Sequence, residues 1–164
     1  MSDIQQNEKS PITDVVVRIN RCAKVVKGGR RFSFSSLVVA GDGKGRVGLG
    51  SGKAKEVPAT IKKGQKTALK NMVEVRLHEG GTIAHPVKGT FGSTIVYLYP
   101  ASLGTGIIAC AAVRSVIEKA GYHNVMTKVH GSTNPTNVVK ATLDGLKKIK
   151  DIRDVEKLRG VKLR

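Results

Sequence analysis

The chain has 164 residues, a length that suggests one domain or two small ones. Apolar residues make up 40% of it, enough for a packed core, but its longest fully apolar run, residues 107–113, is far shorter than the ~20 residues of a membrane-spanning helix. A formal net charge of +17 excludes a neutral or acidic surface and favours a polyanionic partner, with nucleic acid as the leading candidate and a merely soluble basic surface as the alternative.

The net positive charge is densest in residues 18–70. Residues 1–17 carry a net charge of −2, residues 18–70 carry +12 and residues 71–164 carry +7. The first residues are polar and lack an apolar signal core or an Arg-rich transit pattern, so we expect residues 1–14 to form a disordered tail of a cytoplasmic protein. Cys22 and Cys110 lie far apart, and we expect both to be reduced thiols.

Residues 15–54 predict three strands joined by two tight turns. The strand at residues 15–26 alternates from Val17 onward and has one basic face. The first turn, KGGRR at residues 27–31, combines two glycines with three cations. The second turn, GDGKG at residues 41–45, is typical of a hairpin.

A helix is expected to follow these strands. Pro58 suits the first helical turn, and apolar or small residues recur from Val57 to Val75 at spacings of three and four. Lys62, Lys66 and Lys70 form a separate stripe on this helix. Residues 15–76 are therefore predicted to form a β-β-β-α domain.

A G-x-G-x-x-G pattern at Gly43, Gly45 and Gly48 spans the second turn and the start of the third strand. A dinucleotide loop requires a helix at that point and an acidic residue about 20 positions later, and neither is indicated here. A Walker loop is also excluded, because Ala54 follows Lys53 where a hydroxyl residue is needed. We instead expect Val47 and Leu49 to pack under the helix, which leaves the glycine face of the strand open to a close backbone approach.

Residues 77–149 predict a second unit of the order β-β-α-β-α. Strands are expected at residues 82–88 and 93–99, then a helix that begins after Gly106 and ends at Gly121. A further strand precedes a last helix, capped by Thr133 or Asn134. Residues 150–164 are expected to be a charged tail.

Signals of catalysis are absent from the sequence. It contains no C-x-x-C, H-E-x-x-H or G-x-S-x-G pattern, and its four histidines are dispersed. We therefore expect no enzymatic activity, no catalytic residue, no metal and no cofactor.

The basic clusters favour RNA contact over the simpler interpretation of solvated turns and helix faces. Glycines at a turn let backbone N–H groups approach a phosphate while neighbouring cations neutralise it. The scarcity of aromatic residues favours recognition of helical RNA by shape and phosphate over stacking of unpaired bases. We expect rRNA contacts from Arg18, Arg21, Lys24, Lys27, Gly28, Gly29, Arg30, Arg31, Lys44, Arg46, Lys53, Lys55, Lys62, Lys66 and Lys88.

Two long stretches carry a family resemblance. The first is VKGGRRFSFSSLVVAGDGKGRVGLGSGKAKEVPATIKK, and the second comprises HPVKGTFGSTIVYLYPAS, GTGIIA and HGSTNPTNVVKATLDGL. Over roughly residues 15–149 the chain resembles bacterial small-subunit ribosomal protein five, the uS5 family. The resemblance implies an α+β fold of two small domains, an N-terminal β-β-β-α double-stranded-RNA-binding-like domain and a C-terminal β-β-α-β-α sandwich.

The resemblance also implies a structural role in the small ribosomal subunit, at the junction of its head and body. Expected partners are small-subunit rRNA, ribosomal proteins four and eight and, at the entry channel, mRNA; no membrane or small-molecule substrate is expected. The loop at Val26, Lys27, Gly28, Gly29 and Arg30 would lie near the spectinomycin region. Gly104, Thr105, Gly106 and Arg114 would face protein four and contribute to translational accuracy.

The sequence departs from common family patterns at Ala23, where Ser is frequent, and at Cys110 and Ala111, where Gly is common. These positions bear on the drug response and on interface packing. Two alternatives stay open. One is a double-stranded-RNA-binding module outside the ribosome, which the second motif-bearing domain disfavours. The other is a nucleotide-dependent enzyme, which is disfavoured because the G-x-G-x-x-G pattern is not followed by a helix.

Overall fold

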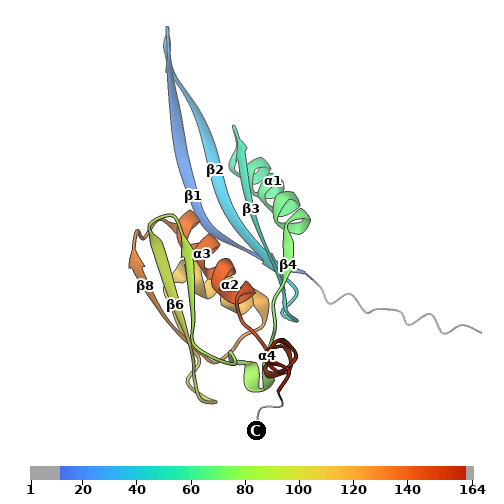
Figure 1. Ribbon diagram of the computed structural model, residues 1–164. Helices are drawn as coiled ribbons and strands as arrows, with labels where there is room; N and C mark the ends of the chain where they lie inside the picture. The colour runs from blue at the N-terminus through green and yellow to red at the C-terminus, as the bar shows by residue number, and fades with distance from the viewer. Residues whose placement is uncertain (1–11, 162–164) are drawn as a thin grey trace, which may run out of the picture.

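The computed structural model describes residues 12–161, which form two four-stranded sheets with helices packed against them (Figure 1). The first sheet has the order β1-β2-β3-β4, and all its neighbouring strands are antiparallel. Its strands are β1 (Thr13–Val26), β2 (Gly29–Gly41), β3 (Arg46–Ala54) and the short β4 (Met72–Glu74). The second sheet has the order β5-β6-β8-β7. This arrangement confirms the predicted α+β class.

The helix α1 (Val57–Lys70) covers one face of the first sheet, and glycines make that contact possible. A Cβ atom added at Gly48, Gly50 or Gly52 would overlap a backbone oxygen of α1, belonging to Ala68, Gly64 and Thr60 respectively. Because the helix has no acidic residue in its first turn and no side-chain cap, this close packing is its main support.

The prediction that Val47 and Leu49 pack under α1 is therefore wrong. Successive side chains of a strand point to opposite faces, and the glycines occupy the α1 face. Val47 is fully buried on the other face, in a core shared with the second sheet and its helices. The expected close backbone approach to the glycine face does occur, and the backbone is that of α1.

The helix predicted from the apolar periodicity was also too long. We predicted a helix to Val75, but α1 ends at Lys70 with Asn71 as its C-cap. Residues 72–74 form β4, which pairs with β3 through Val47 and Val73. The spacing of three between Met72 and Val75 favours a helix, but pairing of residues 72–74 with the open edge of β3 decided the outcome.

The second unit contains β5 (Val87–Phe91), β6 (Thr94–Pro100), β7 (Ile107–Ile108), α2 (Ala111–Ala120), β8 (Val125–Gly131) and α3 (Pro135–Lys147). The predicted strand at residues 82–88 begins only at Val87, after a 3-10 turn at Glu79–Gly81. The predicted helix after Gly106 starts later, at Ala111, because residues 107–108 join β8 as a parallel edge strand. Both predicted helix ends are confirmed, with Gly121 left-handed at φ +100° and the Asn134 side chain accepting a hydrogen bond from Thr136 N.

The two units meet through backbone and apolar side chains. On one side, Leu37, Val39 and Val47 of the first sheet join the core that contains Val116 and Ile117 of α2. At the end of α2, the N–H groups of the 41–45 turn donate to helix carbonyls, Gly43 N to Lys119 O at 3.1 Å and Gly45 N to Ala120 O at 2.9 Å. The predicted domain limits, 15–76 and 77–149, stay a prediction, since the core is continuous across them.

The two ends of the chain differ from the predicted tails. Thr13 and Asp14 belong to β1, so the predicted disordered segment 1–14 is too long; its residues 1–11 lie outside the described part. The predicted charged tail contains a helix, α4 (Ile152–Arg159), capped by the Asp151 side chain, and its residues 162–164 lie outside the described part. Among residues 12–161 no helix is long and apolar enough to cross a membrane.

Candidate nucleic-acid interface

The longest projection of the fold is the β1–β2 hairpin. Residues 34–41 of β2 pair with both β1 and β3, whereas residues 29–33 pair with β1 alone. Residues 22–33 therefore extend beyond the rest of the first sheet, as the blue hairpin at the top of Figure 1 shows. We call this segment the hairpin extension.

The hairpin extension ends in a two-residue turn, Lys27 and Gly28, between the paired residues Val26 and Gly29. Gly28 and Gly29 have φ values of +99° and +135°, which other residues rarely adopt, and an added Cβ would meet nothing within 4 Å. The glycines are thus required by the turn conformation, and the space where a side chain would lie at these two positions is open.

Cations lie on both faces of this hairpin. Lys24 and Arg31 are paired across the strands and share one face, while Arg30 lies on the other face, opposite Val25. All three cations are exposed, as is Val25 at 74%. No acidic residue occurs between Val15 and Gly41, so no carboxylate of the hairpin extension neutralises these cations.

An aromatic contact fixes the orientation of one further cation. The guanidinium carbon of Arg21 lies 3.7 Å from the centre of the Phe32 ring, on the same face as Arg30. A cation held against a ring loses less side-chain entropy when it binds a phosphate. Arg18, by contrast, donates from Nε to the Asn20 side chain at 2.9 Å.

The helix α1 and the end of β3 carry the next predicted group. Lys53, Lys55, Lys62 and Lys66 are all exposed. Lys63, which the prediction did not include, donates from Nζ to Lys53 O at 3.4 Å and adds a cation between β3 and the helix. These residues and the hairpin extension belong to the same sheet and its covering helix.

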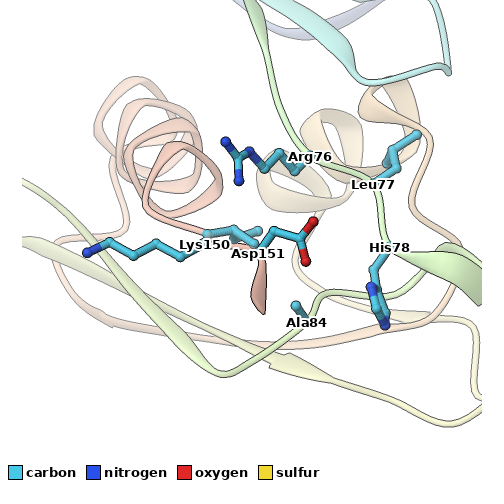
Figure 2. A pocket seen from close by; sticks show the side chains of 7 residues that line it. Arg76, Leu77, His78, Ala84, Lys150 and Asp151 are labelled. Carbon is cyan, nitrogen blue, oxygen red and sulfur yellow. The ribbon is translucent and has the colours of Figure 1, made fainter. Parts of the chain in front are cut away.

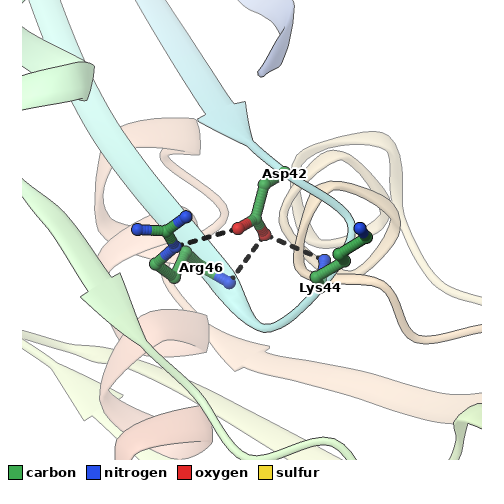
Figure 3. A network of polar contacts seen from close by, with 3 residues as sticks. All are labelled: Asp42, Lys44 and Arg46. Carbon is green, nitrogen blue, oxygen red and sulfur yellow. Dashed lines mark hydrogen bonds and ion pairs between the residues drawn. The ribbon is translucent and has the colours of Figure 1, made fainter. Parts of the chain in front are cut away.

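Lys44 and Arg46 lie at the opposite end of β2 from the hairpin tip, about 40 Å away at 3.3 Å per residue. Their turn is organised by Asp42, which accepts hydrogen bonds from Lys44 N (2.8 Å), Arg46 N (3.0 Å) and Arg46 Nε (2.9 Å), as Figure 3 shows. Arg46 is therefore partly neutralised, and the turn itself contacts the second unit. The structure does not bring these two residues together with the hairpin.

The Asp42 carboxylate is almost completely buried, with 2% of its side chain exposed. Burial on its own would raise the pKa of Asp42, but the hydrogen bonds from Lys44 and Arg46 and the Arg46 charge outweigh it, so its pKa is lowered. The carboxylate thus fixes the turn that joins the two units.

Lys88 is separated from the first sheet altogether. It lies on β5, exposed, with its ammonium 5.8 Å from the centre of the Tyr97 ring. The sequence prediction missed the neighbouring rings, Tyr97, Tyr99 and His130. Their signal was the Tyr spacing of two in an alternating strand, which puts both rings on one face.

The segment expected to face protein four forms a loop between β6 and β7, except for Arg114, which lies on α2. Gly104 and Gly106 have φ values of +89° and +73°, and Thr105 is held by its N–H to Ser102 O at 3.2 Å. Arg114 reaches back from α2 and donates to Ile107 O at 3.0 Å. These four residues therefore lie together at one edge of the second sheet.

A small cavity of about 210 Å³ lies where the chain passes between the units (Figure 2). It is lined by Arg76, Leu77, His78, Ala84, Ile149, Lys150 and Asp151. In the view of Figure 2 the Asp151 carboxylate lies between Arg76 and His78. Asp151 caps α4 through a hydrogen bond from Ile152 N at 2.7 Å, so its role is structural. No group of three or more potential metal ligands occurs in residues 12–161.

Comparisons with known proteins cover nearly all of the chain. The family described as "Ribosomal protein S5, N-terminal domain" matches residues 12–76, and "Ribosomal protein S5, C-terminal domain" matches residues 89–159. A protein named small ribosomal subunit protein uS5 from Syntrophobacter fumaroxidans is 56% identical over 94% of this chain and 93% of its own length. One of the same name from Shewanella amazonensis is 53% identical over 95% of this chain and 92% of its own length.

Proposed function

The chain belongs to the ribosomal protein S5 (uS5) family and is a structural, non-enzymatic constituent of the small ribosomal subunit, and from this premise we propose how it engages that subunit. The hairpin extension inserts between segments of small-subunit rRNA. Its cations bind phosphates on both faces, and the open glycine tip allows a backbone N–H to approach a third phosphate.

The observation that carries this proposal is the acid-free hairpin that projects beyond its sheet. Six cations, Arg18, Arg21, Lys24, Lys27, Arg30 and Arg31, lie on β1, β2 and their turn with no acidic residue among them. A folded core gains nothing from so long an uncovered hairpin, whereas a polyanion that fills the space around it would be bound along its whole length.

The second part of the proposal is mechanical. The first unit binds rRNA, and the second unit docks on ribosomal proteins four and eight, so that the rigid connection between them holds the head of the subunit relative to its body. Support comes from the backbone hydrogen bonds between the 41–45 turn and the end of α2, which leave little freedom for one unit to move against the other.

We further propose that Gly104, Thr105, Gly106 and Arg114 contribute to translational accuracy at the protein-four interface, that Val26 to Arg30 affect the spectinomycin response, and that mRNA passes near the chain at the entry channel. The grouping of Arg114 with the 104–106 loop supports the first of these. An Arg114→Ala strain with unchanged stop-codon readthrough would argue against it. The subunit, and with it the protein, would reside in the cytoplasm.

The experiment for the main proposal is a double charge reversal, Lys27→Glu with Arg30→Glu, in cells in which this is the only copy of the protein. We expect a large loss of the variant from the small-subunit peak in sedimentation of the lysate, or an altered spectinomycin response. Each substitution changes the charge by −2 at an exposed turn or strand position, so the fold of the isolated chain should be kept.

A matched control is Lys147→Glu with Lys157→Glu, which changes the net charge equally at exposed positions of α3 and α4. Normal assembly, accuracy and drug response of the hairpin double variant would refute the proposed role of the hairpin. Equal defects in the two variants would show that net charge, and not the hairpin, is what matters. A wild-type chain absent from the small-subunit peak would favour the module outside the ribosome.

A further inference from the structure

One face of the second sheet is left without a helix. The helices α2 and α3 pack on the face that contains Gly89, Val96 and Leu98, where a Cβ at Gly89 would overlap Ala141 O of α3. Strand alternation places a different set of side chains on the other face. This open face consists of Lys88, Thr90, Ile95, Tyr97, Tyr99, Ile108, Met126, Lys128 and His130.

The open face is organised in rows that cross the strands. The first row runs Lys88, Tyr97, Lys128, because Tyr97 pairs with Lys88 on β5 and with Lys128 on β8. The second runs Tyr99, Met126, Ile108, and these three side chains are 41%, 44% and 50% exposed. A basic and aromatic row therefore lies beside an apolar one.

The rings are held in place by one another. Tyr97 and Tyr99 are nearly parallel, with ring centres 6.3 Å apart and an angle of 13° between the planes. His130 meets the Tyr97 ring edge-on at 5.3 Å, and the Lys88 ammonium lies 5.8 Å from the same ring centre. Tyr97 is thus packed on its neighbours, and Tyr99 presents its ring to solvent.

The charge of this face has one sign. None of the residues of β5, β6, β7 and β8 is acidic, and the cations Lys88 and Lys128 are both exposed. A protein surface that met these rings would have to supply acids for two lysines beside an aromatic platform. A nucleic acid strand supplies both phosphates for the lysines and bases for the rings, at the spacing of a single chain.

We propose that the open face of the second sheet binds unpaired RNA, with a base stacked on Tyr99 and the adjoining phosphates bound by Lys88 and Lys128. The other two side chains of the second row, Met126 and Ile108, cover the edge of the stacked base. Stacking tolerates any base, because every base has a π-face, so we expect little sequence preference. The site differs in chemistry from the hairpin extension, whose contacts are with phosphates.

This inference rests on the proposed function only in that the chain binds RNA, and its test can be separated from that of the hairpin. The chain has three tyrosines and no tryptophan, and the third, Tyr122, is fully buried. Quenching of the tyrosine fluorescence by a stacked base therefore reports on Tyr97 and Tyr99, which are the only tyrosines that a base can reach. RNA bound to the hairpin alone leaves this signal unchanged.

The first experiment titrates the full chain with an oligoadenylate of about 12 nucleotides and with an abasic ribose-phosphate strand of the same length, in salt high enough to weaken purely electrostatic binding. We expect saturable quenching of tyrosine fluorescence by the oligoadenylate and none by the abasic strand. Equal quenching by both strands, or quenching by neither, would overturn the proposal.

Variants then locate the site. Tyr99→Ala should weaken the quenching-detected affinity about tenfold, while Tyr99→Phe should keep it, since the ring alone stacks. The pair Lys88→Gln and Lys128→Gln tests the same site without touching the rings, and should weaken binding and reduce its salt dependence. The hairpin variant Lys27→Glu with Arg30→Glu should leave the quenching amplitude at saturation intact. Wild-type affinity in both the Tyr99→Ala chain and the lysine pair would overturn the assignment.

A second experiment uses assembled small subunits irradiated with ultraviolet light. We expect an RNA-linked peptide that contains Tyr97 and Tyr99. If amine-reactive cross-links instead join Lys88 and Lys128 to a neighbouring protein, and no RNA-linked peptide from β6 is recovered, the face is a protein interface and the proposal is wrong.

Discussion

Replacing Gly50 by Ala tests the contact on which the first unit depends. Gly50 lies in β3 directly under α1, and an added methyl group would overlap Gly64 O and Ala68 N and lie 3.0 Å from Ala68 Cα. All three atoms belong to the helix backbone, so no side chain can rotate away. The helix would have to move off the sheet as a whole.

The cost can be worked from the interactions that this movement disturbs. Overpacking a rigid site costs about 1–3 kcal/mol. Lifting α1 also lengthens the buried hydrogen bond from Ser36 Oγ to Thr60 O, now 3.0 Å, which is worth about 1 kcal/mol. Ala is the better strand former, but that gain is below ~1 kcal/mol. We expect a net loss of about 2–3 kcal/mol, or about 5–10 °C in Tm for a chain of this size.

The assay is urea and thermal unfolding of the purified chain, followed by far-ultraviolet circular dichroism. Ser51→Ala is the control, because Ser51 is the next residue of the same strand, is exposed, and points to the opposite face. It should change the free energy of unfolding by less than about 0.5 kcal/mol. A Gly50→Ala chain as stable as the wild type would show that α1 does not pack rigidly on the glycines of β3.

Two further predictions concern groups with shifted pKa values. Asp42→Asn should destabilise the chain by about 1–3 kcal/mol at neutral pH. Because folding lowers the pKa of Asp42, the stability that its carboxylate contributes is present above the unfolded pKa of ~3.9 and is lost as the pH falls through the lower folded pKa. The unfolding curves of the variant and the wild type should therefore converge in acid, and a difference that persists there would contradict this prediction. The Tyr122 hydroxyl donates a hydrogen bond to Arg76 O at 2.5 Å, so Tyr122→Phe should lower the free energy of unfolding by about 1 kcal/mol. Because burial raises the pKa of Tyr122 to about 12, the same substitution should leave the tyrosinate absorbance of the folded chain unchanged up to about pH 11. The stability due to this raised pKa is present below the unfolded value of ~10 and is lost as the pH rises through 12, and a drop in absorbance below pH 11 in the variant would show that Tyr122 ionises earlier.

Local signals predicted most of the elements. The two hairpin turns, the left-handed Gly121 and the Asn134 cap follow from residue types whose conformational preferences hold wherever they occur. Two of the errors fall where a short apolar stretch could be either a helix or a strand, at residues 72–75 and 107–110. At both places the chain formed a strand because it paired with the free edge of a sheet, and the sequence alone does not indicate which sheet edge is free.

Of the two candidate RNA-binding surfaces, one could be predicted from the sequence and the other could not. The hairpin extension and its cations could be named from charge and glycine alone. The open face of the second sheet could not, because Lys88, Tyr99, Lys128 and His130 are spread over more than 40 residues and come together only through the pairing of β5, β6 and β8. A low aromatic content argued against base stacking, but two of the six aromatic residues, together with His130, gather on this one face.

The sequence by itself determined the class of partner, the absence of a nucleotide loop, and the family, since these depend on net charge, on the spacing of glycines and on long motifs. The tertiary structure decided which face of β3 each residue serves. In β3, valine and leucine alternate with glycine, so one face of the strand carries apolar side chains and the other carries none. The alternation does not say which face meets the helix, and the larger side chains led us to predict the valine and leucine face. Close packing reversed that expectation: a helix backbone can approach a sheet most closely over glycine, and the valine and leucine were left for the core that joins the two units.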